Sequence, residues 1–181
     1  MREIESACRG AQPNAGHHYI AELQNDCEVC VLTQNVDGLH RAAGSENLIE
    51  IHGCLNELRC TSCRWRCRVD DYAQLGDLPQ CPDCEAVIRP AVVLFEEMLP
   101  MQALAHLENE LAKGFDLIFS IGTTAGFPYI FEPVQSAVAL GIDTVEINPA
   151  PTVLSDSVRW QVSAAAADAL SQIRQYGNER E

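Results

Sequence analysis

Residues 33–52, TQNVDGLHRAAGSENLIEIH, concentrate side chains of the types that contact polar ligands. Gln34, Asn35 and Asp37 supply amide and carboxylate groups directly after a short apolar run, VCVL, and His52 supplies an imidazole. In α/β proteins, ligands bind where parallel strands end. Short polar side chains also favour turns and helix caps, so these residues by themselves are equally consistent with an ordinary strand-to-helix connection.

Two CxxC pairs follow later in the chain, Cys60 with Cys63 and Cys81 with Cys84. Four thiolates on two tight turns are the donor set of a tetrahedral zinc site. Because four thiolates leave no open coordination position for a reacting water, we expect a structural rather than a catalytic zinc.

The chain contains nine cysteines, and no apolar segment follows Arg2 to act as a signal peptide. We therefore expect a cytoplasmic protein whose cysteines bind metal or remain reduced. A third CxxC pair, Cys27 and Cys30, leads into a strand instead of opening a helix, so we interpret it as structural thiols and not as a redox pair. The apolar runs are far shorter than the roughly 20 residues of a membrane span.

The chain has 181 residues, 47% of them hydrophobic, which suits one globular domain with a small additional module. Its formal net charge of −14 argues against nucleic-acid binding as the main function, because phosphate binding needs a positive surface. The charge suits a cationic partner such as a lysine-bearing peptide, although solubility is the simpler explanation. Arg59, Arg64, Arg66 and Arg68 crowd the first CxxC pair, so a zinc-ribbon nucleic-acid module stays open as an alternative.

Apolar spacing and end signals predict alternating strands and helices. Strands are expected at residues 29–32, 92–95, 115–121, 144–147 and 158–162, and helices at residues 13–26, 100–113, 133–140 and 164–176. Pro90 argues against an uninterrupted central strand, which is why the second strand is placed at 92–95. The alternation predicts an α/β fold with a largely parallel sheet covered by helices on both faces.

Polar residues at three expected strand ends should line one crevice, namely residues 34–37, residues 122–124 and Asn148. The cysteine-rich segment interrupts the alternation of strands and helices. We therefore expect one domain formed by residues 1–54 and 90–181, with a zinc-binding module at residues 55–89.

Together these motifs resemble the sirtuins, the NAD-dependent protein-lysine deacylases. In chain order, the resemblance is carried by PNAGH, TQNVDGLH, AGS, IEIHG, both CxxC pairs, RPAVVLF, GTT and the IN at Ile147 and Asn148. It covers nearly the whole chain. It implies a partial Rossmann-like NAD-binding domain, a structural Zn2+ ion, NAD as co-substrate and an acyl-lysine protein or peptide as partner.

The resemblance also implies a role for each matching residue. His52 corresponds to the family's catalytic histidine, the general base that takes a proton from the NAD ribose, and an imidazole titrates near neutral pH. Val93 and Phe95 correspond to the segment against which the family clamps its peptide as an added strand. The residues implied to face NAD are Gln34, Asn35 and Asp37 at the nicotinamide and ribose, and Gly122, Thr123, Thr124 and Asn148 at the adenosine half.

Two departures from the family pattern stand out. Glu96 follows Phe95 where the family usually has glycine, so a charged residue replaces a flexible one. Sirtuins also open with a strand, a glycine-rich GAGxS loop that holds the pyrophosphate and a PxFR segment, and residues 1–12 contain neither motif. We therefore expect a weakened NAD site, and unpaired strand edges that favour association.

The leading functional hypothesis is an NAD-dependent protein-lysine deacylase that forms nicotinamide and O-acyl-ADP-ribose, with little or no nicotinamide release expected from residues 1–181. Two alternatives stay open. One is a non-catalytic sirtuin-like binding or interaction protein, and the other is the zinc-ribbon nucleic-acid module.

Overall fold

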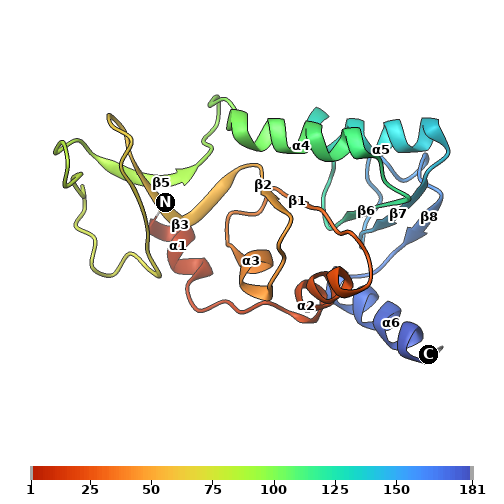
Figure 1. The fold of residues 1–181 in the computed structure, drawn as a ribbon. Helices are drawn as coiled ribbons and strands as arrows, with labels where there is room; N and C mark the ends of the chain where they lie inside the picture. Colours follow the sequence, from red (N-terminus) through yellow and green to blue (C-terminus); the bar gives the residue numbers. More distant parts are fainter. Residues whose placement is uncertain (1, 180–181) are drawn as a thin grey trace. The chain divides into compact units, whose positions relative to one another are not determined.

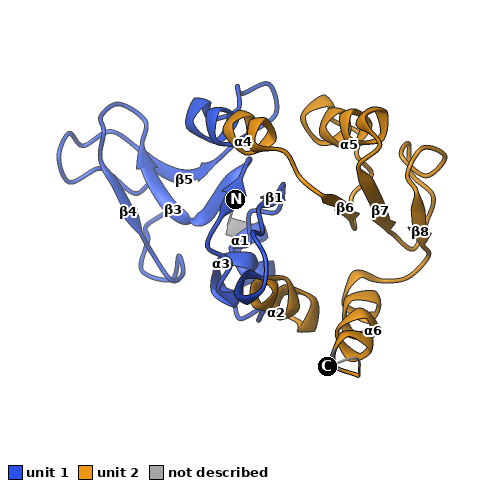
Figure 2. Ribbon diagram, turned by 45° about the vertical axis from the view of Figure 1, so that its right-hand side comes forward, with its two compact units in different colours: residues 1–13, 24–107 blue, residues 14–23, 108–181 orange. Residues whose placement is uncertain are grey.

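The chain is organised in two compact units in the computed structural model, which describes residues 2–179 (Figure 2). Unit 1 consists of Met1–Pro13 and Gln24–Leu107, and unit 2 consists of Asn14–Leu23 and Glu108–Glu181. Unit 1 contains the segment expected as a zinc-binding module, residues 55–89, together with residues before and after it. Each unit builds its own apolar core.

The predicted site residues Gln34, Asn35 and Asp37 follow the first strand of a two-stranded parallel sheet in unit 1 (Figure 1). Strand β1 (Val31–Thr33) pairs with strand β2 (Leu48–Glu50), and the short helix α3 (Leu39–Ala43) lies in the connection between them. The strand expected at residues 29–32 is therefore present but shifted toward the polar cluster. Because β1 ends at Thr33, the polar residues that follow it lie at the carboxyl end of a strand.

Three antiparallel strands form the cysteine-rich lobe of unit 1. Strand β3 (Gly53–Cys60) is central, between β4 (Arg66–Arg68) and β5 (Ile88–Val92). The prediction of a strand at residues 92–95 is wrong, because the segment that pairs with β3 ends at Val92 and includes Pro90. Proline is tolerated there because β5 is an edge strand whose register with β3 is shifted by an irregularity.

The core of this lobe lies on one face of the three strands. Leu58, Cys60 and Ile88 project from β3 and β5 and pack with Tyr72 and Cys81. All five side chains are buried, so the turns that carry the cysteines are held by apolar contacts as well as by their own sequence.

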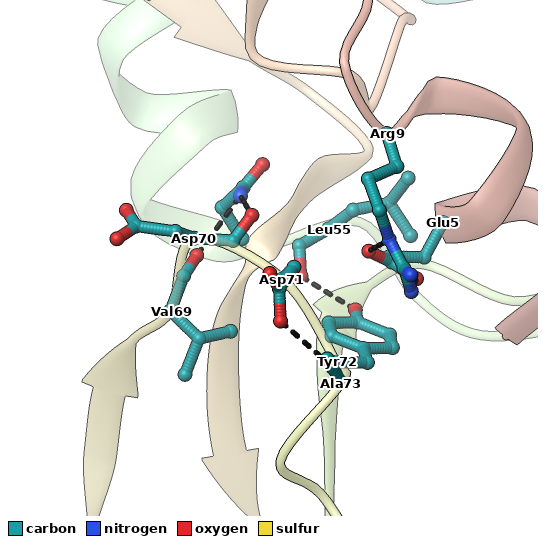
Figure 3. A network of polar contacts seen from close by, with 9 residues as sticks. Glu5, Arg9, Leu55, Val69, Asp70, Asp71, Tyr72 and Ala73 are labelled. Atoms are coloured by element: carbon teal, nitrogen blue, oxygen red, sulfur yellow. Dashed lines mark hydrogen bonds and ion pairs between the residues drawn. The ribbon is translucent and has the colours of Figure 1, made fainter.

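A polar network ties the loop after β4 to strand β3 (Figure 3). The Tyr72 hydroxyl donates a hydrogen bond to the Leu55 carbonyl oxygen at 2.6 Å. The side-chain amide of Asn56 donates to the carbonyl oxygens of Val69 and Asp70 at 2.9 and 3.1 Å. Because Tyr72 is 4% exposed, its hydrogen bond is shielded from water and fixes the loop against the strand.

Helix α1 (Arg2–Cys8) lies beside this network (Figure 3). The Glu5 carboxylate on this helix forms an ion pair with Arg9 at 2.6 Å, and Glu5 is only 6% exposed. A buried carboxylate needs such a partner, because desolvation otherwise disfavours its charge. This helix was not among the elements expected from the sequence.

Helix α4 (Met101–Lys113) crosses the division between the units at Leu107 and agrees with the helix expected at residues 100–113. Within unit 1, His106 Nε2 lies 2.9 Å from the Asn47 side-chain oxygen, so the middle of α4 is tied to the segment before β2. None of the described helices is both long and apolar enough to span a bilayer.

A three-stranded parallel sheet forms the centre of unit 2, in the order β6-β7-β8. Its strands are Leu117–Ile121, Asp143–Ile147 and Trp160–Val162. Helix α5 (Pro128–Leu140) covers one face, and helices α2 (Ala15–Glu22) and α6 (Ala166–Asn178) cover the other (Figures 1 and 2). Unit 2 therefore has the three layers that the alternating pattern predicted.

The helices of unit 2 differ from the sequence-based expectations mainly at their ends. Helix α5 begins at Pro128, not at residue 133, because proline suits the first turn of a helix, where its missing N–H is not needed. Pro133 then lies inside the helix. Helix α2 is shorter than expected and begins after Asn14, whose side chain accepts hydrogen bonds from the Gly16 and His17 N–H groups, and a 3-10 turn (Leu23–Asn25) follows it.

Strand β6 is the edge of the unit 2 sheet. Its side chains Leu117 and Phe119 are 42% and 39% exposed. Exposed apolar edge strands favour association, so the expected association through sheet edges stays a prediction.

Candidate catalytic and NAD-binding site

His52 lies in the turn between β2 and β3, half-buried. Its Nδ1 atom is 3.1 Å from the backbone carbonyl oxygen of Gln34, the residue that follows β1. A carbonyl oxygen can only accept, so Nδ1 must carry the hydrogen, and in the neutral ring Nε2 carries the lone pair. The parallel pairing of β1 with β2 brings these two residues together, because both follow the carboxyl ends of paired strands.

The polar residues after β1 are arranged by hydrogen bonds to the backbone. The Asn35 N–H donates to Thr33 Oγ1 at 3.1 Å, and Asp37 Oδ1 accepts from the Leu39 N–H at 3.0 Å at the start of α3. Asp37 therefore also has the local turn and capping role that the sequence left open. Asn35 is exposed, and Gln34 is half-buried beside its carbonyl contact with His52.

Asp37 also lines a cavity of about 300 Å³ within unit 1. Cys8 from α1, Arg41 from α3 and Arg68 from β4 line the same cavity. Burial and the nearby Asp37 and Glu5 carboxylates raise the pKa of the Cys8 thiol, so this cysteine stays protonated near neutral pH. The cavity is therefore a polar space lined by fixed charges, not a site of thiolate chemistry.

The segment after β5 lies next to His52. The Val93 N–H donates a hydrogen bond to the His52 carbonyl oxygen at 2.9 Å, whereas the Phe95 side chain is fully exposed. Glu97 closes the segment, because its Oε2 atom accepts from the Leu94 N–H at 3.0 Å and from Arg89 at 2.7 Å. The Arg89 hydrogen bond lowers the pKa of Glu97, so this carboxylate is charged at neutral pH.

Glu96 has a backbone φ of 69°. This left-handed conformation strains residues with a side chain, whereas glycine adopts it freely. The position at which the sequence departs from the family's glycine is therefore one at which the backbone favours glycine.

The expected adenosine-side residues lie together in unit 2, after β6 and β7. The Gly122 N–H donates to the Ile147 carbonyl oxygen at 2.9 Å, which joins the two strand ends. The Asn148 side-chain amide donates to the Thr123 carbonyl oxygen at 2.8 Å, and the Thr123 hydroxyl oxygen accepts from the Ala125 N–H at 3.1 Å. Thr124, the next residue of this loop, is exposed.

Glu146 belongs to the same strand end and was not expected from the sequence. It is 3% exposed, and its two carboxylate oxygens accept hydrogen bonds from the hydroxyls of Thr152 and Ser155, the latter at 2.5 Å. These bonds hold the loop after Asn148 against the sheet. The sequence could have indicated this role, because Glu146 lies between the apolar Val145 and Ile147, and a carboxylate inside a buried strand needs hydrogen-bonding partners.

The four expected zinc ligands converge in unit 1. The sulfur atoms of Cys60 and Cys84 lie 3.4 Å apart, those of Cys63 and Cys81 lie 3.6 Å apart, and all four lie within 4.8 Å of one another. A tetrahedral site with Zn–S bonds of about 2.3 Å needs sulfur atoms roughly 3.8 Å apart. The cluster therefore fits one structural zinc ion held by four cysteines.

Backbone groups prepare this cluster for metal binding. The N–H groups of Ser62 and Cys63 point at the Cys60 sulfur at 3.3 and 3.4 Å. The Ser62 hydrogen bond is the main cause that lowers the pKa of Cys60 to about 6. The thiolate is the form that binds metal, so Cys60 is prepared for zinc binding at neutral pH, whereas burial and the neighbouring cysteines raise the pKa of Cys63 to about 12.

Each unit thus gathers its own part of the expected site. Unit 1 brings His52 against Gln34 and Val93 and assembles the four cysteines, and unit 2 brings Asn148 against Thr123.

The Sir2 family model matches residues 2–127. The chain is also 49% identical over 177 residues to "NAD-dependent protein deacylase 2" of Pseudomonas aeruginosa, an alignment that covers 96% of this chain and 69% of that relative. This chain belongs to the Sir2 family. The resemblance of the sequence to the sirtuins is thereby confirmed.

Solved structures place the fold of this sirtuin in the same family. A Sir2 homologue in complex with NAD superimposes with a TM-score of 0.88 at 33% identity, covering 96% of this chain and 68% of the other. A Sir2 protein bound to an acetylated peptide gives a TM-score of 0.86 at 28% identity, covering 95% and 74%. The sirtuin Rossmann-like α/β fold with a cysteine-rich zinc module is therefore confirmed.

Proposed function

We propose that this sirtuin is an NAD-dependent protein-lysine deacylase and that His52 is its general base. The observation that carries the proposal is the contact of His52 Nδ1 with the Gln34 carbonyl oxygen, 3.1 Å away. This contact fixes the ring tautomer in which Nε2 can take a proton. The names of the relatives and the NAD complex of the structural neighbour support the reaction class.

In the proposed reaction, the acyl-lysine carbonyl oxygen attacks C1′ of the NAD ribose and nicotinamide leaves. His52 then takes a proton from a ribose hydroxyl, and that oxygen attacks the adduct. Water then adds to the acyl carbon of this adduct and the lysine amine leaves, so the products are free lysine, nicotinamide and O-acyl-ADP-ribose. Gln34, Asn35 and Asp37 contact the nicotinamide and ribose in this proposal.

The adenosine half of NAD is assigned to Gly122, Thr123, Thr124 and Asn148. Support comes from their placement at the carboxyl ends of two parallel strands, where nucleotides bind in sheets of this type. Gly122, with φ of 60°, presents backbone without a side chain at this point.

The substrate is assigned to the segment of Val93 and Phe95. β5 is an edge strand, and edge strands can accept an extended peptide through backbone hydrogen bonds. An acetylated-peptide complex of a structural neighbour supports this class of substrate.

The test is nicotinamide release from NAD in the presence of an acetyl-lysine peptide, measured for residues 1–181 and for two variants. His52→Asn should lower the peptide-dependent rate by at least about a hundredfold, because general-base catalysis contributes on this scale. His18→Asn is the matched control, since His18 is exposed on helix α2, and it should leave the rate unchanged. Equal and measurable rates for His52→Asn and the unmodified chain would contradict the assignment.

A second function, NAD binding without deacylation, is favoured by the backbone of Glu96. Its left-handed φ of 69° on a charged residue strains the segment proposed to receive the peptide. Calorimetry with NAD and nicotinamide release with the peptide separate the two functions. Heat of NAD binding without peptide-dependent release supports the binding function, and turnover excludes it.

A further inference from the structure

Strand β4 and its flanks alternate between two kinds of side chain. Trp65, Cys67 and Val69 pack against the core of the zinc-binding lobe. Arg64, Arg66 and Arg68, here called the arginine stripe, alternate with them and are exposed. Since successive side chains of a strand point to opposite faces, Arg66 and Arg68 project together on the solvent face of β4, and the exposed Arg64 lies just before the strand.

The arginine stripe differs from the other cations of the chain in having no ion pair. Every other lysine or arginine whose side chain the structure describes forms one: Arg9, Arg41, Arg59, Arg89, Lys113, Arg159 and Arg174. A chain with 26 acidic residues and 12 basic ones has acids to spare. Among the described side chains, the cations without an ion pair nevertheless lie at alternate positions of one short segment, residues 64–68.

Arginines on the neighbouring strands add positive charge to the stripe at Arg66, whereas Glu57 of β3 lies directly opposite Arg68. Arg66 lies directly opposite Arg59 of β3, and Arg59 lies directly opposite Arg89 of β5, so a row of like charges crosses the sheet. Directly opposed like charges destabilise a sheet. Glu97 offsets part of this repulsion, at 2.7 Å from Arg89 and 4.0 Å from Arg59, but its contacts are on the β5 side of the row.

β4 is also an edge strand, because the sheet order is β4-β3-β5. Its outer N–H and C=O groups can therefore pair with an added strand. Arginines along one strand face recur about every 6.8 Å, and so do alternate side chains of an added strand. Acidic residues at every second position of such a strand would face the stripe in register.

We propose that the arginine stripe and the outer edge of β4 bind an extended acidic peptide segment of a partner protein, with Asp or Glu at alternate positions. The stripe supplies the complementary charge, and β4 supplies backbone pairing. A nucleic acid has no peptide backbone to pair with β4 and carries one charge per nucleotide. The net charge of −14 repels such a long polyanion more than it repels a short peptide.

The test uses a fluorescein-labelled peptide of alternating Glu and Thr, with binding followed by fluorescence anisotropy at low and high salt. The probe should bind the full chain at low salt and weaken as salt rises. A peptide of the same composition with its Glu residues in one block should bind more weakly, because only alternate residues share a strand face. Equal binding of the two peptides would overturn the strand geometry and with it the proposal.

The decisive variant is Arg66→Gln with Arg68→Gln, which leaves Arg64 beside the zinc ligand Cys63 unchanged. It should weaken the probe about tenfold, the scale expected for two exposed ion pairs. The matched control, Arg159→Gln with Arg174→Gln, removes the same charge from unit 2 and should change affinity less than twofold. Zinc content equal to that of the unmodified chain checks that the lobe is folded.

Three further results would overturn the proposal. The first is no binding of the alternating probe at low salt. The second is equal weakening by the stripe variant and by the control variant, which would indicate general electrostatics. The third is a single-stranded oligonucleotide that displaces the probe at lower concentration than the unlabelled peptide does, which would assign the stripe to nucleic acid.

Discussion

A Cβ atom on Gly53 would lie 1.9 Å from the carbonyl oxygen of Ala91. Gly53 has φ of 77°, follows His52 directly and opens strand β3 at the point where it pairs with β5. No side chain fits between these two backbones, so the glycine lets the turn that carries His52 approach β5, the strand before the segment proposed to bind the peptide.

Gly53→Ala should therefore lower the free energy of unfolding by at least about 2 kcal/mol and reduce nicotinamide release. Urea denaturation measures the first effect. Gly114→Ala is the matched control, because Gly114 has φ of 83° but open space around its Cβ position. It should cost only the backbone strain, about 1 kcal/mol, and equal losses for the two variants would contradict the proposed close approach.

Glu96→Gly should stabilise the chain by about 0.5 to 1 kcal/mol, because it relieves a left-handed backbone at φ of 69°. The entropy of a more flexible unfolded chain offsets part of the gain. We expect the midpoint of urea unfolding to shift to a higher urea concentration. Glu85→Gly, at φ of 62°, should give a similar gain but leave peptide-dependent nicotinamide release unchanged.

Removal of zinc should unfold the cysteine-rich lobe, because its turns converge on four sulfur atoms within 4.8 Å. Elemental analysis should find one zinc ion per chain, and a chelator should lower the melting temperature. Cys84→Ser should abolish zinc binding. Cys67→Ser is the control, because Cys67 packs in the same core outside the cluster, and retention of zinc by Cys84→Ser would contradict the assignment.

Tyr72 should make stability depend on pH above pH 10. Burial, with smaller contributions from Glu5 and Cys54, raises the pKa of Tyr72 to about 12 from 10 in the unfolded chain. The folded state thus holds the phenol proton more tightly. The contribution of Tyr72 to the free energy of unfolding is therefore complete below pH 10 and is lost as pH rises toward 12. The loss should be on the order of 2 kcal/mol.

Tyr72→Phe should remove this alkaline dependence together with the 2.6 Å hydrogen bond to Leu55. At pH 8 the variant should be less stable by about 1 kcal/mol, the usual net value of such a bond. The measurement is the difference in urea stability between the two proteins at pH 8 and at pH 11. A difference that does not shrink with pH would contradict the shifted pKa.

Asn148→Ala should raise the KM for NAD several-fold without changing the KM for the peptide. The Asn148 side chain bridges the Thr123 carbonyl oxygen at 2.8 Å and the Ala150 N–H at 3.3 Å, so its removal loosens both loops at the proposed adenosine side. Steady-state kinetics with each substrate varied in turn test this. An equal rise in both constants would indicate general damage and not a cofactor role.

The zinc ligands could be predicted from the sequence because their signal is local. Two residues between paired cysteines place both thiolates on one tight turn whatever the rest of the fold does. Strand β5 could not be placed correctly, since a strand's limits depend on its partner. Only the pairing of Ile88 with Cys60 and of Val92 with Gly53 shows that Pro90 lies on a tolerant edge.

Helix α5 shows the same limit for helices. Pro133 suggested a start, but Pro128 occupies the first turn and packing of Val134 on the sheet holds the helix through the second proline. Glu146 was missed for a related reason, because its partners Thr152 and Ser155 lie beyond the strand and meet it only in the folded unit.

By itself, the sequence determined the alternating strands and helices, the four thiolate ligands and the family motifs, including His52, because each depends on residue type at short spacing. Only the tertiary structure decided which ring nitrogen of His52 carries its proton, which conformation Glu96 must adopt and which arginines have no ion pair. These properties depend on contacts between residues far apart in the chain, and short-range spacing carries no information about such contacts.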